Sequence, residues 1–92
     1  MSLLSDEEIS VRLEGLAHWT RQGDSIVSVR KRGSFSAAML YAGAVAYLAE
    51  AANHHPDLLI QWDTVTLTLS THSAGGLTDK DFALAGKISE LG

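Results

Sequence analysis

Three of the chain's four histidines lie close together in the sequence, at His54, His55 and His72. The first two stand where an apolar segment ends, and the third stands just before a loop that contains two glycines. Imidazole titrates near pH ~6.5, so one histidine can donate a proton while another accepts one. Several histidines without a serine or cysteine nucleophile suit the addition or elimination of water better than acyl transfer.

A metal site and a structural role are the alternatives for these histidines. Zinc can be held by three histidines. However, His54 and His55 are adjacent, and neighbouring side chains of an extended stretch point to opposite faces. No Asp or Glu stands out as a further ligand, so we predict metal-free acid/base chemistry. A single histidine at the end of a helix or strand is usually a capping or solvated residue, and we interpret His18 as structural. Three histidines at such ends weaken that interpretation for His54, His55 and His72.

Four further residues could support the histidines. Glu50 and Asp57 could orient the imidazoles, or they could simply be solvated. Asp81 has the position of a residue that starts a helix. Trp62 is more typical of a packing residue, although it could also form one wall of a site for a flat heteroaromatic ligand.

The first half of the chain predicts a helix, a hairpin and a second helix. Ser5 and Glu8 have the spacing of a capping box, which predicts a helix over 5–15. Two extended segments, 18–21 and 25–32, are expected to pair around Gly23. In the second segment Val27 and Val29 would share one face of the strand, with Ser28 and Arg30 on the other. A largely apolar helix is predicted from 36 to about 53.

The second half predicts two strands and a last helix. Pro56 is expected to end the apolar helix and to bias His55 toward an extended conformation. Strands are predicted over 57–62 and 64–71, the second with Val65, Leu67 and Leu69 on one face. Thr78, with Asp81 three residues later, is expected to cap the last helix.

The predicted order is therefore α-β-β-α-β-β-α. It indicates a single α+β domain over residues 1–92. Its four-stranded, mostly antiparallel sheet would carry three helices on one face.

Composition excludes several functional classes. The net charge is -4, which argues against direct nucleic-acid binding because a basic surface would be needed. The absence of cysteine excludes disulfides and thiolate metal sites. The apolar run 35–49 is shorter than the roughly 20 residues of a membrane span, and no signal peptide is recognisable. We therefore expect a cytoplasmic protein with no membrane partner.

The spacing of these residues resembles the pterin-4a-carbinolamine dehydratase family, also known as the dimerisation cofactor family. The match begins at Glu50, followed after three residues by His54-His55-Pro56 and after five more by Trp62. His72 follows after nine residues and Asp81 after eight. The segment from Thr71 to Asp81 also resembles the family's, and the order of elements agrees over nearly the whole chain.

The resemblance implies loss of water from a 4a-hydroxytetrahydropterin to give the quinonoid dihydropterin, a step in tetrahydropterin recycling. It implies no metal and no cofactor. His54 and His72 would be the acid/base pair, with neither role assigned. His55 would help bind the pterin, and Trp62 and Asp57 are further binding candidates. Glu50, Pro56 and Asp81 would be supporting residues.

Two departures from the family concern the choice of pterin. Leu58-Leu59 stands where many members have an aromatic residue, and Trp62 stands where tyrosine is common. The family fold also serves as a non-enzymatic protein-binding module, as a transcriptional coactivator or an assembly factor, which is the alternative function. A homodimer or homotetramer is expected, because the helix 36–53 is apolar on nearly every side.

Overall fold

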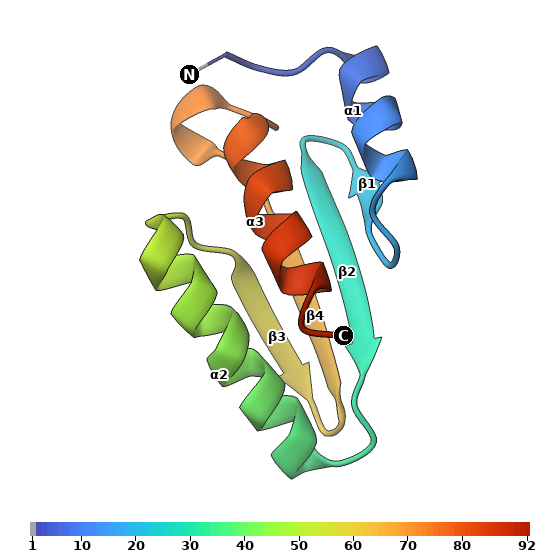
Figure 1. Ribbon diagram of the computed structural model, residues 1–92, viewed down its shortest axis with the longest axis vertical. Helices are drawn as coiled ribbons and strands as arrows, with labels where there is room; N and C mark the ends of the chain where they lie inside the picture. Colours follow the sequence, from blue (N-terminus) through green and yellow to red (C-terminus); the bar gives the residue numbers. More distant parts are fainter. Residues whose placement is uncertain (1) are drawn as a thin grey trace.

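The computed structural model describes residues 2–92, and it confirms the predicted order of elements (Figure 1). One short element was not predicted, the 3-10 helix η1 that begins at His72. The elements are α1 (Asp6–Glu14), β1 (Thr20–Gln22), β2 (Ser25–Lys31), α2 (Phe35–Ala52), β3 (Asp57–Gln61), β4 (Thr64–Leu69), η1 (His72–Ala74) and α3 (Asp79–Ser89).

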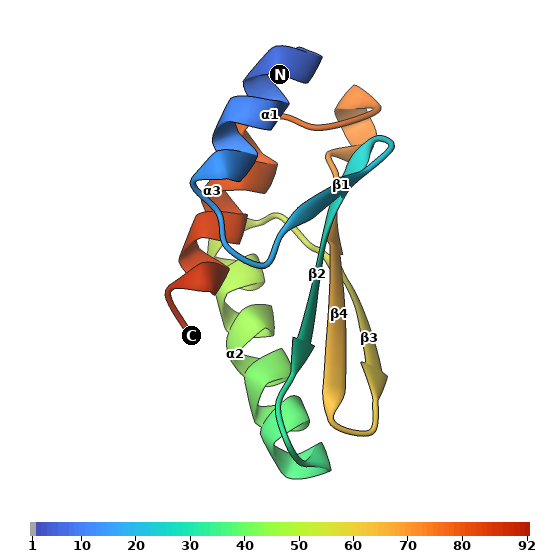
Figure 2. The ribbon, with the colours of Figure 1, turned by 90° about the vertical axis from the view of Figure 1, so that its right-hand side faces the viewer.

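The four strands form one sheet in the order β1-β2-β4-β3, with every neighbouring pair antiparallel. The two predicted hairpins therefore meet through β2 and β4, where Val27 lies opposite Thr68. The three helices cover one face of this sheet and leave the other face open, as predicted (Figure 2). Because β3 and β4 are antiparallel, the end of β4 lies next to the start of β3. The helix α2 ends at this same end of the sheet.

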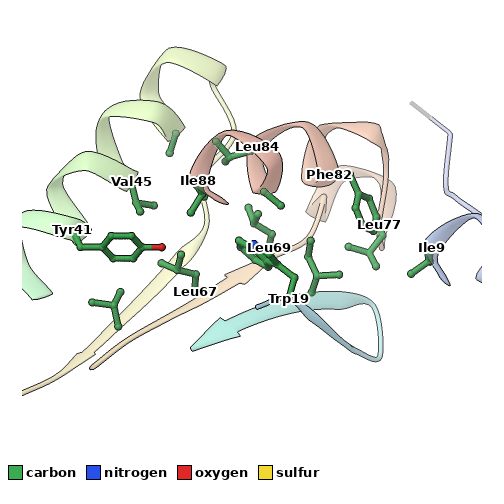
Figure 3. Packing of buried hydrophobic residues seen from close by; sticks show 14 of the residues in the cluster. Ile9, Trp19, Tyr41, Val45, Leu67, Leu69, Leu77, Phe82, Leu84 and Ile88 are labelled. Carbon is green, nitrogen blue, oxygen red and sulfur yellow. The ribbon is translucent and has the colours of Figure 1, made fainter. Parts of the chain in front are cut away.

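The core lies between the sheet and the helices (Figure 3). The inward face of β4 carries Val65, Leu67 and Leu69, which are fully buried as the alternation predicted. Val45 of α2 and Ile88 of α3 pack into the same cluster. Because this apolar surface is continuous from α2 to α3, it fixes how the ends of those two helices approach each other.

The structure decides which face of β2 meets the helices, which the predicted alternation left open. Ser28 is 2% exposed and faces the helices, whereas Val29 is 60% exposed on the open face. The residue that decides the orientation is Ile26, which is fully buried in the core. Since strand side chains alternate with a period of two, a buried Ile26 turns Ser28 inward and Val29 outward.

The helix α2 ends at Ala52, four residues before Pro56 and close to the predicted end at about residue 53. Asn53 adopts a left-handed conformation, with φ 50° and ψ 43°, and asparagine tolerates this region better than most residues. By length and composition α2 could also cross a membrane. Its face with Ala38, Val45 and Ala49, however, is part of the core, so α2 is a core helix of this fold.

Candidate active site

The structure brings the three predicted histidines to one cleft of about 260 Å³. The cleft is lined by residues from the end of α2, from η1 and from the start of α3. These segments lie in the upper half of Figure 1. The end of α2 is distant in the sequence from the segment that follows β4, and the fold brings the two together. The lining residues are Asn53, His54, His55, Ser70, Thr71, His72, Ser73 and Lys80.

The turn after α2 separates the two adjacent histidines. The left-handed Asn53 turns the chain, and the His54 backbone N–H donates to the Ala49 carbonyl at 3.1 Å. The His54 side chain is then 11% exposed, whereas the His55 side chain is 56% exposed. Pro56, the next residue in the chain, is buried. The two imidazoles therefore meet different environments, which fits the expectation that adjacent side chains diverge.

His54 contacts a carboxylate that water does not reach. Its Nε2 lies 2.6 Å from Oδ1 of Asp81, and Asp81 is 0% exposed. The other oxygen, Oδ2, accepts from the Thr71 hydroxyl at 2.7 Å and from the Thr78 backbone N–H at 2.9 Å. The Thr71 and Thr78 hydroxyl oxygens are themselves 2.8 Å apart. Each of these buried polar groups therefore has a partner, which is the condition for a stable buried network.

These contacts determine which nitrogen of His54 carries the proton. Oδ2 of Asp81 accepts from two donors, and a carboxylate offers only an acceptor at Oδ1 as well. Nε2 of His54 must then donate to Oδ1, and in the neutral ring Nδ1 keeps its lone pair. A carboxylate that fixes the tautomer and the ring plane in this way is a recurring feature of histidines that act as general bases.

His55 and His72 have more open surroundings. Nε2 of His55 lies 2.6 Å from Oε1 of Glu50, but the Glu50 side chain is 79% exposed, so solvent weakens this pair. His72 begins η1, and its side chain is exposed at the mouth of the cleft. The cleft thus combines one rigid, buried imidazole with two that solvent reaches.

Two of the predicted site residues lie elsewhere. Trp62 is in the turn between β3 and β4, with φ 52° and 68% of its surface exposed. Asp57 begins β3, and the five residues from Asp57 to Gln61 place Trp62 roughly 16 Å further along the strand. Asp57 itself is exposed and is not part of the cleft lining. Trp62 is therefore far from the histidines of its own chain, whereas Asp57 follows His55 by two residues without lining the cleft.

The sequence interpretation did not include Thr71 or Lys80 in the site. A signal for Thr71 was present, because it continues the inward series of Val65, Leu67 and Leu69 and is therefore a polar residue on a buried face. Such a residue needs a hydrogen-bond partner, here Asp81. Lys80 gave no signal, since its position depends on how α3 packs. Within residues 2–92, no group of three or more His, Cys, Asp or Glu side chains is placed to hold a metal ion.

Comparison with known proteins gives a consistent result. Residues 2–91 match the family model described as pterin 4 alpha carbinolamine dehydratase. A protein of Roseiflexus castenholzii is 54% identical over 90 residues, covering 98% of this chain and 97% of its own. One of Nocardia farcinica is 55% identical over 89 residues, covering 97% and 94%. Both carry the name "Putative pterin-4-alpha-carbinolamine dehydratase".

Two solved structures are similar in fold. A transcriptional coactivator/pterin dehydratase from Brucella melitensis has a TM-score of 0.93 at 29% identity, with 98% of both chains covered. A pterin dehydratase-like protein identified as a RuBisCO assembly factor in the alpha-carboxysome has a TM-score of 0.67. It is 24% identical and covers 79% of this chain and 87% of its own, so it supports the fold alone.

Proposed function

Because the chain belongs to the pterin 4 alpha carbinolamine dehydratase family, we propose that it removes water from a 4a-hydroxytetrahydropterin to give the quinonoid dihydropterin. The observation that carries this proposal is the buried pair of His54 and Asp81, 2.6 Å apart, beside a cleft that His72 also lines. Such a pair supplies a proton acceptor of fixed orientation, and His72 supplies a second group that can exchange protons with solvent.

In the proposed reaction the proton on N5 passes to one imidazole, and a double bond forms between N5 and C4a. The C4a–O bond breaks as the other imidazole protonates the departing hydroxyl, which leaves as water. The arrangement around His54 supports its role as the base, because Nε2 is held by Asp81 and Nδ1 is left to accept a proton. The exposed His72 is then the acid. The chemistry needs no metal and no added cofactor.

The remaining residues have supporting roles in this proposal. His55 lines the cleft and would bind the pterin, with Glu50 orienting its ring. Asp81 orients His54, and the buried Pro56 supports the turn that separates the two adjacent histidines. The physiological setting would be tetrahydropterin recycling in the cytoplasm, with the whole chain acting as one domain.

The test is the rate of dehydration of a 4a-hydroxypterin by single variants. His54→Ala and His72→Ala should each lower the rate by roughly 10²–10⁴, the usual contribution of a general acid or base. His54→Gln keeps an N–H donor for Asp81 and separates loss of the base from loss of the buried contact. His18→Asn is the matched control, because it removes an exposed imidazole and asparagine tolerates the φ of 74° at that position.

The outcome that would overturn the proposal is a wild-type rate in both alanine variants. Urea unfolding of each variant is measured in parallel, so that a rate lost through unfolding is recognised as such. A metal assay on protein purified without a histidine tag tests the metal-free chemistry separately, because one zinc per chain would contradict it.

A protein-binding function is the second candidate, and one observation favours it. The outer face of α2 exposes large apolar side chains, at Phe35, Met39, Leu40 and Tyr47. Such a face suits contact with another chain, either as a homodimer or homotetramer or with a different protein. Capture of a stoichiometric partner, together with the absence of pterin turnover, would favour this function over the dehydratase.

A further inference from the structure

A second, smaller cavity of about 130 Å³ adjoins the histidine cleft. It lies between the end of α2 and the face of α3 that carries Lys80 and Lys87. His54 and Lys80 line both cavities, so the two meet at these side chains. The lining of the smaller cavity, here called the Lys80–Lys87 groove, consists of Ala52, His54, Lys80, Ala83, Leu84 and Lys87.

The groove has a cation toward each end and small apolar residues between them. Lys80 and Lys87 are seven residues apart on α3, which places them on the same helix face about 10 Å apart along the axis. Ala83 lies between them on that face, and Ala52 lines the groove from α2. Short alanine side chains on both helices leave the space that a ligand group could occupy.

The charges of the groove are unusual for this chain. The net charge is -4 and only three lysines are present, yet two of them line this one groove. Among residues 2–92 neither lysine forms an ion pair. The two carboxylates next to Lys80 in the sequence are already engaged, since Asp79 pairs with Arg12 and Asp81 holds His54. In the part of the chain that the structure describes, no carboxylate lines either cavity, so both ammonium groups are available to an anion.

We propose that the Lys80–Lys87 groove binds an anionic group on the substrate's side chain, and that the preferred substrates are therefore pterins with a carboxylate or phosphate substituent at C6. This inference rests on the proposed function. In a pterin C6 is bonded to N5, the atom that loses its proton. With N5 beside His54, a substituent on C6 lies next to the same imidazole, which also lines the groove.

The size of the groove limits what it can hold. A volume of about 130 Å³ compares with a share of roughly 30 Å³ for one water in the liquid. It therefore accommodates one carboxylate or one phosphate ester near the ring and leaves any longer chain in solvent. Two ammonium groups are point charges without a fixed planar geometry, so the groove selects for charge rather than for one anion shape.

The test compares equilibrium binding of stable, oxidised pterins by fluorescence quenching. The probes are 6-hydroxymethylpterin as the neutral ligand, 6-carboxypterin, and the phosphate monoester of 6-hydroxymethylpterin. The wild type should bind the two anionic pterins more tightly than the neutral one. The ratio of the affinity for an anionic pterin to that for the neutral pterin is the anionic-to-neutral ratio. Lys80→Met and Lys87→Met should each reduce this ratio by about five-fold, the upper end for a solvent-exposed ion pair. Lys31→Met, which removes the same charge at the end of β2, should keep the wild-type ratio.

The outcomes separate this inference from the proposed function, because the binding assay does not need turnover. If the wild type dehydrates a pterin but the anionic-to-neutral ratio is unchanged in both groove variants, the proposed anion site is wrong and the proposed dehydratase activity is supported. If the ratio falls in the groove variants but no pterin is dehydrated, the proposed anion site is supported and the proposed dehydratase activity is contradicted. Loss of the ratio in Lys31→Met as well would mean that overall charge, not the groove, sets the preference. A preference for only one of the two anions would contradict selection by charge alone.

Discussion

The two capping boxes of this protein have nearly the same sequence pattern but different surroundings. At the start of α1, Ser5 and Glu8 exchange hydrogen bonds of 2.9 and 3.1 Å at an exposed helix end. At the start of α3, Asp81 accepts from the Thr78 backbone N–H at 2.9 Å, but Asp81 is fully buried. Besides the Thr78 N–H and the Thr71 hydroxyl, the Asp81 carboxylate has a third partner, because its other oxygen contacts His54.

The comparison shows how a capping residue gains a second role. Glu8 uses its carboxylate for the helix alone, and water competes for it. Asp81 uses one oxygen for the helix and the other for an imidazole, in a place where water cannot replace either contact. The first turn of α3 therefore fixes the ring of His54, so that helix formation and site geometry depend on the same carboxylate.

The largest effect is expected from Asp81→Asn. The amide oxygen can still accept from the Thr78 N–H, but the amide nitrogen can donate to His54 Nε2 and stabilise the wrong tautomer. Turnover should fall by roughly two to four orders of magnitude. The free energy of unfolding should fall by about 2 kcal/mol, since hydrogen bonds to a buried charge are lost. Steady-state kinetics and urea unfolding measure the two effects.

Asp79→Asn is the matched control for that variant. Asp79 is also in the first turn of α3, but its side chain is 75% exposed and pairs with Arg12 at the surface. Turnover should stay at the wild-type level, and stability should change by no more than about 0.5 kcal/mol. A comparable loss of turnover in both variants would show that the charge of the helix start, not the contact with His54, is what matters.

The next largest effect is expected from Thr71→Val. Valine keeps the shape but removes the hydroxyl that donates to Asp81 Oδ2. The free energy of unfolding should fall by about 1–3 kcal/mol, and turnover should fall less than in Asp81→Asn because Thr78 still holds the carboxylate. Thr66→Val, on the open face of β4, is the control with little expected effect. Equal destabilisation by both substitutions would mean that the buried network contributes nothing of its own.

A smaller effect is expected from Ser5→Ala in the exposed box. Loss of the N-cap hydroxyl should lower the free energy of unfolding by about 1 kcal/mol or less. Turnover at saturating substrate should not change, because α1 contributes nothing to the histidine cleft. A clear fall in turnover would contradict the separation between the two boxes.

The smallest effect is expected from Glu8→Gln, and it should depend on pH. The hydrogen bond from the Ser5 backbone N–H, followed by that from its hydroxyl, lowers the pKa of Glu8 below its ordinary value of 4.5. A lowered pKa in the folded state stabilises the fold above the ordinary value, and this stabilisation is lost as the pH falls through the folded pKa. Wild type and variant should therefore differ in stability at about pH 7 and converge in strong acid. A difference that is independent of pH would contradict this explanation.

Some features of the fold could be predicted because they depend on neighbouring residues. Both capping boxes, the Gly23 turn and the inward face of β4 follow from spacing over a few positions, and the structure confirms them. The orientation of β2 could not be settled locally. Ile26 and Val29 are both apolar and lie on opposite faces, so the face buried under the helices depends on pairing with β4.

The sequence by itself determined the order of elements, the family and the three histidines of the cleft, because these are properties of residue types and spacing along the chain. Only the tertiary structure decided that Asp81 is buried against His54, that Thr71 completes that contact, and that Trp62 lies at the far end of β3. It also decided that Lys80 lies at the cleft. These placements depend on how α2, α3 and the end of β4 pack together, and that packing is set by contacts between residues far apart in the sequence.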